Sequence, residues 1–474
     1  MFDQIHEECG VFGIYNNDGR SIAHETYLAL YALQHRGQNS CGIAINDSGV
    51  MKVHKDLGLV PDVFDEKSLA ELGSGDIAIG HVRYSPSNET ERANNQPLVM
   101  RYVKGTIAIA CNGTLVNTHE IRKELEQGGA IFQTSSDLEL VAYLIARARL
   151  KSGSIEAALK EAMAKIEGAY SLVLMSPRKL IACRDPHGFR PLCMGKLGES
   201  YVFASETCAF DSIGAEFVRD VEPGEIILVD ENGMKSIRGM ECTKSSLCIF
   251  EHVYVARPDS VIDGASVHMA RQKAGAFLAK RTPVDADIVI GVPDSGLDAA
   301  LGYANESGIP YGTGFIKNRY VGRTFIQDSQ IRRERSVKIK LNPLAAAVKG
   351  KRVVMIDDSI VRGTTSAHIV ELLRKAGATE VHVRISSPPF MHPCYFGTDI
   401  DSRDKLIACR MSIDEICKSI GADSLAYLEL EDLMQIAPES TCDFCNGCFT
   451  GIYPVDIPGE VPVDKFNQKI VKNK

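Results

Sequence analysis

The feature that most constrains the fold lies in the last third of the chain. An apolar run, Lys351–Asp357, ends beside a second acid, Asp358, and a loop rich in glycine and threonine leads into a helical pattern. Thr364 or Thr365 can cap this helix, whose apolar residues share one face, and Gly377 is its stop signal. A strand that ends in acids and runs directly into a helix is typical of a parallel α/β sheet.

The neighbouring residues repeat this order of elements. A second apolar strand, Asp287–Pro293, is followed by a loop and a helical stretch, Leu297–Ser307, and Val381–Ser386 has the composition of the next strand. Strands that alternate with helices predict an α/β domain over residues 250–474. Such a domain binds its ligands at the carboxyl ends of the strands.

The first half of the chain has a different pattern. Between residues 10 and 240, many short apolar runs are separated by Gly, Asn and Pro, which is typical of strands. Two helical patterns, Asp137–Lys151 and Ile155–Lys165, interrupt them. We therefore expect an α+β domain over residues 9–240, with the boundary between the halves in Cys242–Ser260.

Size and charge narrow the possible functions. The chain has 474 residues, 45% of them hydrophobic, and a net charge of −8, so two to four domains are expected and attraction to nucleic acid or anionic membranes is not. Any phosphate must be held by local donors. No apolar run is long enough to span a bilayer, and residues 1–8 do not resemble a signal peptide, so a cytoplasmic location is expected.

Cys9 is the first candidate nucleophile. If the eight residues before it are removed as a propeptide, Cys9 gains a free α-amine that can serve as the general base for its own thiol. Alternatively, Cys9 is an ordinary strand residue of an unprocessed chain. The residue taken alone does not separate these two interpretations.

The sequence around Cys9 and the motifs that follow it resemble those of the N-terminal-nucleophile (class II) glutamine amidotransferases. Glu8-Cys9-Gly-Val-Phe-Gly is followed, in the family's order, by Leu33-Gln-His-Arg36-Gly, Gly80-His-Val-Arg83, Cys111-Asn112-Gly113 and Ser135-Ser-Asp137. The resemblance implies that Arg83 binds the glutamine carboxylate, Asp137 its ammonium group, and Asn112 and Gly113 the oxyanion. These roles suit the chemistry, because Arg binds a carboxylate with two hydrogen bonds and acyl transfer needs donors aimed at the developing charge.

The strand and loop around Asp357 resemble the phosphoribosylpyrophosphate (PRPP) signature of type I phosphoribosyltransferases. The resemblance implies that PRPP is bound by Asp357, Asp358, Ser359, Arg362, Gly363, Thr364 and Thr365, and that one Mg²⁺ per subunit lies near Ser295, Asp357 and Asp358. Loop N–H groups and a helix N-terminus can hold a 5′-phosphate, and adjacent carboxylates favour a hard divalent cation. Lys317–Arg323 resembles the family's mobile catalytic loop, or is a solvated surface loop, and Lys340 is a weaker phosphate candidate.

Both signatures in this order resemble one family, the amidophosphoribosyltransferases, which make the first committed intermediate of purine synthesis. The resemblance implies an αββα N-terminal-nucleophile glutaminase domain followed by an α/β type I phosphoribosyltransferase domain. It also implies glutamine and PRPP as substrates, inhibition by purine nucleotides, and a homotetramer. Two alternatives are a glutaminase that serves another phosphoribosyl acceptor chemistry, and a sensor that keeps the PRPP loop for binding only.

The C-terminal cysteines predict a site for a soft metal. Cys442, Cys445 and Cys448 form a Cys-x-x-Cys-x-x-Cys run, which by itself is compatible with zinc, a redox pair or core packing. One branch of the family carries a 4Fe–4S cluster, one per subunit, and resemblance to it implies the ligands Cys248, Cys394, Cys445 and Cys448. Cys442 is left out of this set.

Overall fold

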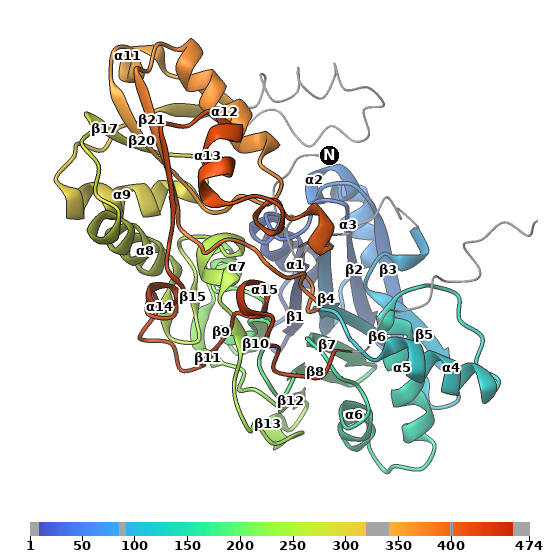
Figure 1. Cartoon of the computed structure of the whole chain (residues 1–474). Coiled ribbons are helices and arrows are strands. Elements are labelled where there is room, and N and C mark those ends of the chain that lie inside the picture. The colour runs from blue at the N-terminus through green and yellow to red at the C-terminus, as the bar shows by residue number, and fades with distance from the viewer. Residues whose placement is uncertain (1–8, 85–91, 319–340, 399, 401, 458–474) are drawn as a thin grey trace, which may run out of the picture.

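Two antiparallel sheets stack face to face in the first half of the molecule (Figure 1). The computed structural model describes residues 9–84, 92–318, 341–398, 400 and 402–457. In order across the sheet, the seven-stranded sheet contains β11 (Glu216–Asp220), β9 (Cys193–Leu197), β10 (Ser200–Ala204), β1 (Gly10–Tyr15), β4 (Ile77–Arg83), β2 (Ser40–Asp47) and β3 (Val50–Leu57). The six-stranded sheet contains β13 (Gly233–Arg238), β12 (Glu225–Asp230), β8 (Lys179–Arg184), β7 (Ser171–Ser176), β6 (Gly105–Asn112) and β5 (Leu98–Tyr102).

Helices cover the outer face of each sheet, which completes the expected αββα order. The seven-stranded sheet packs against α1 (Ile22–Ala32), α2 (Val60–Val63), α3 (Glu66–Leu72) and α7 (Cys208–Ile213). The six-stranded sheet packs against α4 (Thr118–Gln127), α5 (Asp137–Arg149) and α6 (Ile155–Met163). In β6, Ala108 and Ala110 face the core between the sheets, whereas Ile107 and Ile109 face the helices. Both faces of the strand are buried, which explains its continuous apolar run.

The sequence predicted only two helices in this half, and that count was too low. α5 and α6 lie where they were expected, but α1, α2, α3, α4 and α7 were not predicted. In α4 only Ile121 and Leu125 are buried, so a single pair of apolar residues holds a mostly polar helix to the sheet. Such a narrow apolar stripe gives little periodic signal.

The second half contains the predicted parallel sheet. Its order is β17 (Ile288–Gly291), β20 (Arg352–Asp357), β21 (Glu380–Ile385) and β22 (Ser424–Tyr427). One face packs against α8 (Val267–Arg281) and α9 (Gly296–Ser307), and the other against α12 (Thr364–Lys375) and α13 (Ile413–Ile420). Val354 and Ile356 of β20 face the first pair of helices, and Val353 and Met355 face the second.

The predicted helix after the acid pair is present, but its cap differs from the expectation. α12 begins at Thr364, its N-cap is Gly363 with φ +88°, and no side chain caps it. The positive φ favours glycine at this position, and a Cβ there would also lie 2.7 Å from Ile407 Cδ1, so that side chain would have to move. The helix ends at Lys375, and Gly377 follows with φ +98°, as the stop signal predicted.

Short elements connect and extend these units. They are η1 (Arg92–Asn94), η2 (Glu251–Val255, a π-helical turn), the pair β15 (Val261–Ile262) and β16 (Ala265–Ser266), the pair β18 (Phe315–Lys317) and β19 (Leu341–Pro343), α11 (Ala345–Val348), η3 (Arg403–Lys405), η4 (Ile407–Cys409) and α14 (Leu430–Leu433). Among the described residues, no helix is both long and apolar enough to cross a membrane.

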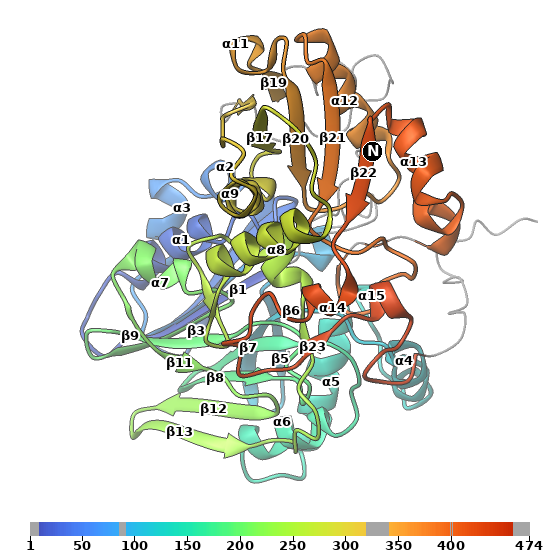
Figure 2. The same cartoon turned by 60° about the vertical axis from the view of Figure 1, so that its left-hand side comes forward.

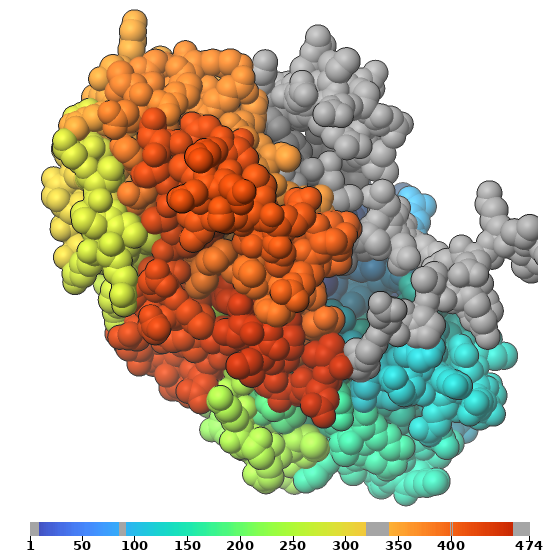
Figure 3. All heavy atoms as spheres, in the orientation of Figure 1, coloured from blue at the N-terminus to red at the C-terminus, as the bar shows by residue number. Residues whose placement is uncertain are grey.

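The C-terminal segment returns to the junction of the two halves. Its strand β23 (Phe444–Cys445) pairs in parallel with β14 (Leu247–Cys248), and the short helix α15 (Gly447–Thr450) follows (Figure 2). In the space-filling view, the red C-terminal segment covers one face between the orange second half and the green and cyan first half (Figure 3). This segment therefore packs against both halves of the molecule.

Candidate active sites

Strand register places Cys9 beside Arg83. β1 pairs with β4 so that Gly10 is opposite Val82, and Cys9 therefore lies across from the end of β4. The Cys9 thiol donates a long hydrogen bond to the Tyr84 carbonyl oxygen, at 3.7 Å. Two residues implied for glutamine chemistry, far apart in sequence, thus meet at one sheet edge.

The end of β6 carries the two residues for which the resemblance implies an oxyanion-binding role. The side chain of Asn112 is 1% exposed, and its amide nitrogen Nδ2 has no hydrogen-bond partner. Leaving a buried amide donor unpaired costs about 1–3 kcal/mol, which is the condition of a donor held ready for a transient charge. Gly113 has φ +127°, and a Cβ there would lie 2.3 Å from the Ala169 carbonyl oxygen, so this position accepts only glycine.

Asp137 begins α5 and faces the same region. Its carboxylate accepts a hydrogen bond from Leu115 N–H at 3.2 Å, and burial raises the pKa of Asp137 to about 6. The segment before it is held by Asn94, whose amide donates to Ser135 Oγ at 2.8 Å. Asn94 was not among the predicted site residues.

His81 joins the strand ends of the two sheets. Its Nε2 lies 3.0 Å from the Cys111 carbonyl oxygen, and burial lowers the pKa of His81 to about 3, so the ring is neutral and donates this bond. Burial also raises the pKa of the Cys111 thiol, and Cys9 and Asp137 are close enough to raise it further. Cys9 and Asp137 therefore both lie near Cys111, which precedes Asn112 and Gly113 in the chain.

The second candidate site lies at the carboxyl end of β20. Asp357 and Asp358 are 8% exposed each, and the hydroxyls of Ser295 and Ser359 both donate to the Asp358 carboxylate. Burial raises the pKa of Asp357 well above its ordinary value, and the charge of Asp358 adds to this shift. Burial likewise raises the pKa of Asp358, against the opposing effect of Ser295. A cation placed between these carboxylates would lower both pKa values.

Residues near the acid pair include the start of α12 and Lys317. Gly363 and Thr364 lie at the N-terminus of α12, where helix N–H groups can hold an anion. Lys317 forms an exposed ion pair at 2.5 Å with Asp294, the residue before Ser295. Residues 319–323, Lys340 and the expected propeptide 1–8 lie outside the described residues.

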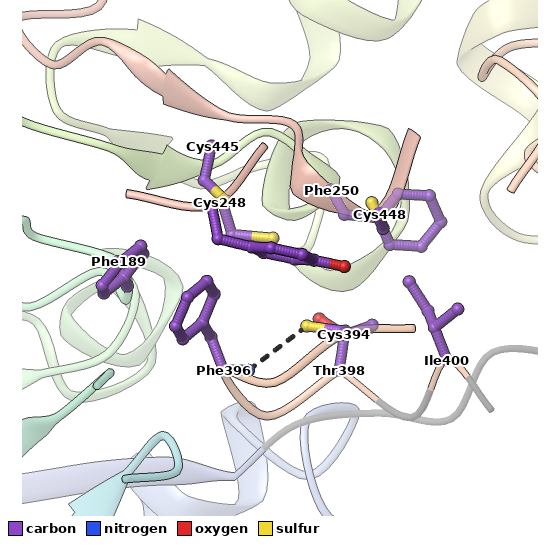
Figure 4. Close-up of a pocket in the computed structure, with 10 residues that line it drawn as sticks. Phe189, Cys248, Phe250, Cys394, Phe396, Thr398, Ile400, Cys445 and Cys448 are labelled. Carbon is purple, nitrogen blue, oxygen red and sulfur yellow. Dashed lines mark hydrogen bonds between the residues drawn. The ribbon is translucent and has the colours of Figure 1, made fainter. Parts of the chain in front are cut away.

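Four cysteines line a single pocket at the junction of the halves. Cys248, Cys394, Cys445 and Cys448 surround it together with aromatic side chains, and Figure 4 shows Cys394 across from Cys248 and Cys445. Cys248 and Cys445 are direct partners in the β14–β23 pair. Cys442 lies elsewhere, in an apolar cluster with Leu247 and Val267. Within the described ranges, no group of three or more His, Cys, Asp and Glu side chains is arranged to hold a metal ion.

Known protein families match both halves of the chain. A model of the glutamine amidotransferase domain matches residues 81–212, and a model of the phosphoribosyl transferase domain matches residues 267–386. An amidophosphoribosyltransferase from Synechocystis sp. is 50% identical over 468 residues, 98% of this chain and 94% of that protein. The chain belongs to the amidophosphoribosyltransferase family.

Further relatives extend the match to other organisms and to a solved structure. An amidophosphoribosyltransferase from Bacillus subtilis is 48% identical over 460 residues, 96% of this chain and 95% of that protein. The solved glutamine PRPP amidotransferase of B. subtilis, in complex with ADP and GMP, superposes with a TM-score of 0.88 and covers 96% of this chain and 99% of that one. The glutaminase and phosphoribosyltransferase folds expected from the sequence are thus confirmed, and the chain is a pentosyltransferase enzyme of purine biosynthesis.

Four charged residues near Cys9 had received no role from the sequence. Arg36, Arg190, Glu206 and Glu251 are each fully buried and form ion pairs with one another. Arg36 was visible in the Gln-His-Arg-Gly motif, but its partners come from distant segments. Sequence spacing carries no signal for such pairs.

Proposed function

We propose that the chain hydrolyses glutamine at Cys9 and uses the ammonia at Asp357 and Asp358 to displace pyrophosphate from PRPP. The products are glutamate, 5-phosphoribosylamine and diphosphate, and the activity is that of the family. The assignment of Cys9 rests above all on the unpartnered, buried amide of Asn112 at the end of β6, in the sheet that packs against the one carrying Cys9. Removal of residues 1–8 would free the Cys9 α-amine.

In the glutaminase reaction, the α-amine of Cys9 takes the thiol proton as Sγ attacks the amide carbon of glutamine. The oxyanion accepts hydrogen bonds from Asn112 Nδ2 and the Gly113 N–H, each worth about 2.7–4 kcal/mol in a site of this kind. The same proton returns to the leaving nitrogen, ammonia departs, and water hydrolyses the thioester to glutamate. Arg83 and Asp137 hold the substrate's carboxylate and ammonium groups.

In the phosphoribosyl reaction, the chain's own residues orient PRPP. Asp357 and Asp358 bind the ribose hydroxyls, and the loop from Ser359 to Thr365, with the N-terminus of α12, binds the 5′-phosphate. Bound Mg²⁺, near Ser295 and the two acids, would neutralise the pyrophosphate as it leaves. The buried acid pair and its raised pKa values support a divalent cation at this place.

The cysteine pocket supports a 4Fe–4S cluster bound by Cys248, Cys394, Cys445 and Cys448. Four thiols around one apolar pocket suit a group wider than a single ion, and thiolates are the ligands that such clusters prefer. Protein purified without oxygen should be brown and contain about four irons per chain. Colourless protein with full activity, or stoichiometric zinc, would refute the cluster and leave the enzyme assignment intact.

The proposal also covers inhibition by nucleotides and the oligomeric state. The B. subtilis relative was solved with ADP and GMP. We expect this chain to bind purine nucleotides as inhibitors and to assemble as a homotetramer. Activity measured against added nucleotide, and the mass of the particle in solution, test these two points separately.

One assay decides the main proposal. Pyrophosphate release should require PRPP and Mg²⁺, and should proceed with either glutamine or an ammonium salt as the nitrogen source. Release from glutamine but not from ammonium salts, or glutaminase activity without any PRPP reaction, would contradict it. The second outcome would favour a different acceptor chemistry.

A further inference from the structure

A buried chain of ion pairs runs from Cys9 to the loop that carries Cys394. The Arg36 guanidinium donates to the Cys9 carbonyl oxygen through Nε at 3.0 Å, and to both oxygens of Glu251 through Nη1 and Nη2, at 2.9 and 2.8 Å. Glu251 also pairs with Arg190, whose Nη1 lies 3.4 Å from Oε1. Arg36, Glu251 and Arg190, here called the Glu251 bridge, have side chains that are 0% exposed.

The far end of the bridge holds the segment after Cys394. Arg190 donates to the Phe396 carbonyl oxygen through Nε and Nη2, at 3.1 and 2.7 Å, and Nη2 also reaches Thr398 Oγ1 at 3.2 Å. This segment lies against the oxyanion region, because a Cβ on Gly397 would be 3.6 Å from the Gly113 Cα. The bridge therefore touches both sides of the glutaminase site, at Cys9 and beside Gly113.

Two residues that bond to Arg190 come from segments next to pocket cysteines. Glu251 opens η2, three residues after Cys248, and Thr398 is four residues after Cys394. Arg36 and Arg190 belong to the glutaminase half. A second carboxylate, Glu206, bonds Arg36 Nη1 at 2.5 Å from within that half. Burial alone would raise the pKa of Glu206, but His35 and Arg36 outweigh it and hold the pKa well below its ordinary range.

We propose that Glu251 is a positioning residue for the glutaminase nucleophile, acting through Arg36 on the backbone of Cys9 and through Arg190 on the segment beside Gly113. The proposal rests on Cys9 being the nucleophile. A bidentate guanidinium–carboxylate pair fixes both partners in plane, and its strength increases away from water. Glu251 thus holds nucleophile and oxyanion donors in one geometry from a residue outside the glutaminase half.

The test uses the full-length enzyme with Glu251→Gln, which keeps the shape of the side chain and removes its charge. Because a displacement of about 1 Å at a reacting group costs about 100-fold in rate, we expect the glutamine-dependent kcat to fall about 10- to 100-fold. The KM for glutamine should stay within about threefold, since neither Arg83 nor Asp137 is altered. Activity with ammonium salts should be unchanged.

The chain offers a matched control in a second buried pair between the halves. Arg184 binds both oxygens of Asp263, at 2.8 and 2.7 Å, with exposures of 0% and 3%, and the pair does not contact Cys9. Asp263→Asn removes the same charge from the same kind of pair, and Asn tolerates the φ of +46° at this position. It should lower the melting temperature as Glu251→Gln does, yet keep the wild-type ratio of glutamine- to ammonia-dependent activity.

The outcomes separate a positioning role from a structural one. A lower ratio in Glu251→Gln alone, partly restored in Glu251→Asp, supports the proposal; equal ratios in both variants overturn it. If Glu251→Gln does not fold, Thr398→Val removes a single hydrogen bond of Arg190 and should still lower the ratio about two- to fivefold. An unchanged ratio there also overturns the proposal. Cys9→Ala, assayed in parallel, tests the nucleophile itself: retained glutamine use would refute the proposed function, whatever Glu251 does.

Discussion

The glutaminase site and the phosphoribosyl site differ in how their charges are paired. Beside Cys9, the guanidinium of Arg36 is bonded to two buried carboxylates, and the amide nitrogen of Asn112, which is unpaired, belongs to a neutral group. At the end of β20, two carboxylates lie side by side, and burial and mutual repulsion raise the pKa of Asp357. Beside Cys9, the charge of Arg36 is neutralised by side chains of the chain itself. At the end of β20, the charges of the two carboxylates would be neutralised by a bound cation.

This difference predicts that substitutions at the two sites will change different kinetic constants. Where the chain supplies its own counter-charges, the geometry exists before the substrate binds, and a lost group should mainly lower kcat. Where a cation and a phosphorylated ligand complete the charge balance, a lost carboxylate should mainly impair their binding.

Replacing the nucleophile should separate the two sites most completely. Cys9→Ser is expected to lower glutamine-dependent activity by about 1,000-fold or more, because a serine hydroxyl is a much weaker nucleophile than a thiol at neutral pH. Activity with ammonium salts should remain, since the phosphoribosyl site needs only ammonia. Parallel assays of pyrophosphate release with both nitrogen sources measure this, and an equal loss of both would show that the sites do not divide the reaction.

Removing one oxyanion donor should have the next largest effect. Asn112→Ala is expected to lower the kcat for glutamine about 100- to 1,000-fold and to leave KM nearly unchanged, because the donor acts on the transition state. Steady-state glutaminase kinetics measure this split. Asn46→Ala is the control: Asn46, in β2, is also buried, at 2% exposure, and its side chain donates to the Pro177 carbonyl oxygen between β7 and β8. A comparable fall in kcat in both variants would argue against a role for Asn112 as a donor.

At the other site, Asp358→Asn should lower the PRPP reaction about 100-fold with either nitrogen source. The substitution removes half of the carboxylate pair and alters the acceptor of the Ser295 and Ser359 hydroxyls, so binding of Mg²⁺ and PRPP should weaken. The KM values for PRPP and Mg²⁺ measure the effect. Glutamine hydrolysis should persist in part; unchanged PRPP turnover in this variant and in Asp357→Asn would mean that the acid pair has been misassigned.

The smallest effect concerns pH. Asp137 binds the glutamine ammonium only as a carboxylate, and its pKa of about 6 lies above the ordinary value, so protonation below pH 6 removes the charge. The Kd for glutamine should therefore rise about tenfold per pH unit below about 6 and be flat above it. Calorimetric titration of the Cys9→Ser variant isolates binding from chemistry. Asp137→Asn should bind weakly at every pH, and a flat profile of the parent down to pH 5 would contradict the role.

The sequence predicted those parts of the molecule that depend on local pattern. β20, α12 and its stop at Gly377 follow from short-range periodicity and backbone requirements, and the αββα half followed from its resemblance to a family. Helix α4 was missed because only two of its residues, Ile121 and Leu125, are buried. The Thr cap of α12 was wrong because the backbone turn at Gly363 already sets the start of the helix.

The site residues that could be predicted from the sequence are likewise those that belong to local motifs. Those within motifs, such as Asn112 and Asp358, could be named from their neighbours in sequence. Glu251 and Arg190 could not, because their partners are fixed by how the halves pack, and a buried ion pair between distant segments has no spacing of its own. The placement of Cys248 against Cys445 also appears only when β14 and β23 are seen to pair.

The pairing of β23 with β14 also determines when, during synthesis, the junction between the two halves can finish folding. β14 leaves the ribosome long before β23, and at about 5–20 residues per second the interval is about 10 to 40 s. During that time the glutaminase half can fold, while the edge of β14 still lacks its partner strand. The nascent enzyme therefore acquires its parts in the order of translation, and the junction between its two chemistries closes last. A chain that ends before Cys445 would lack β23 and two of the four pocket cysteines, so the edge of β14 would stay without its partner strand.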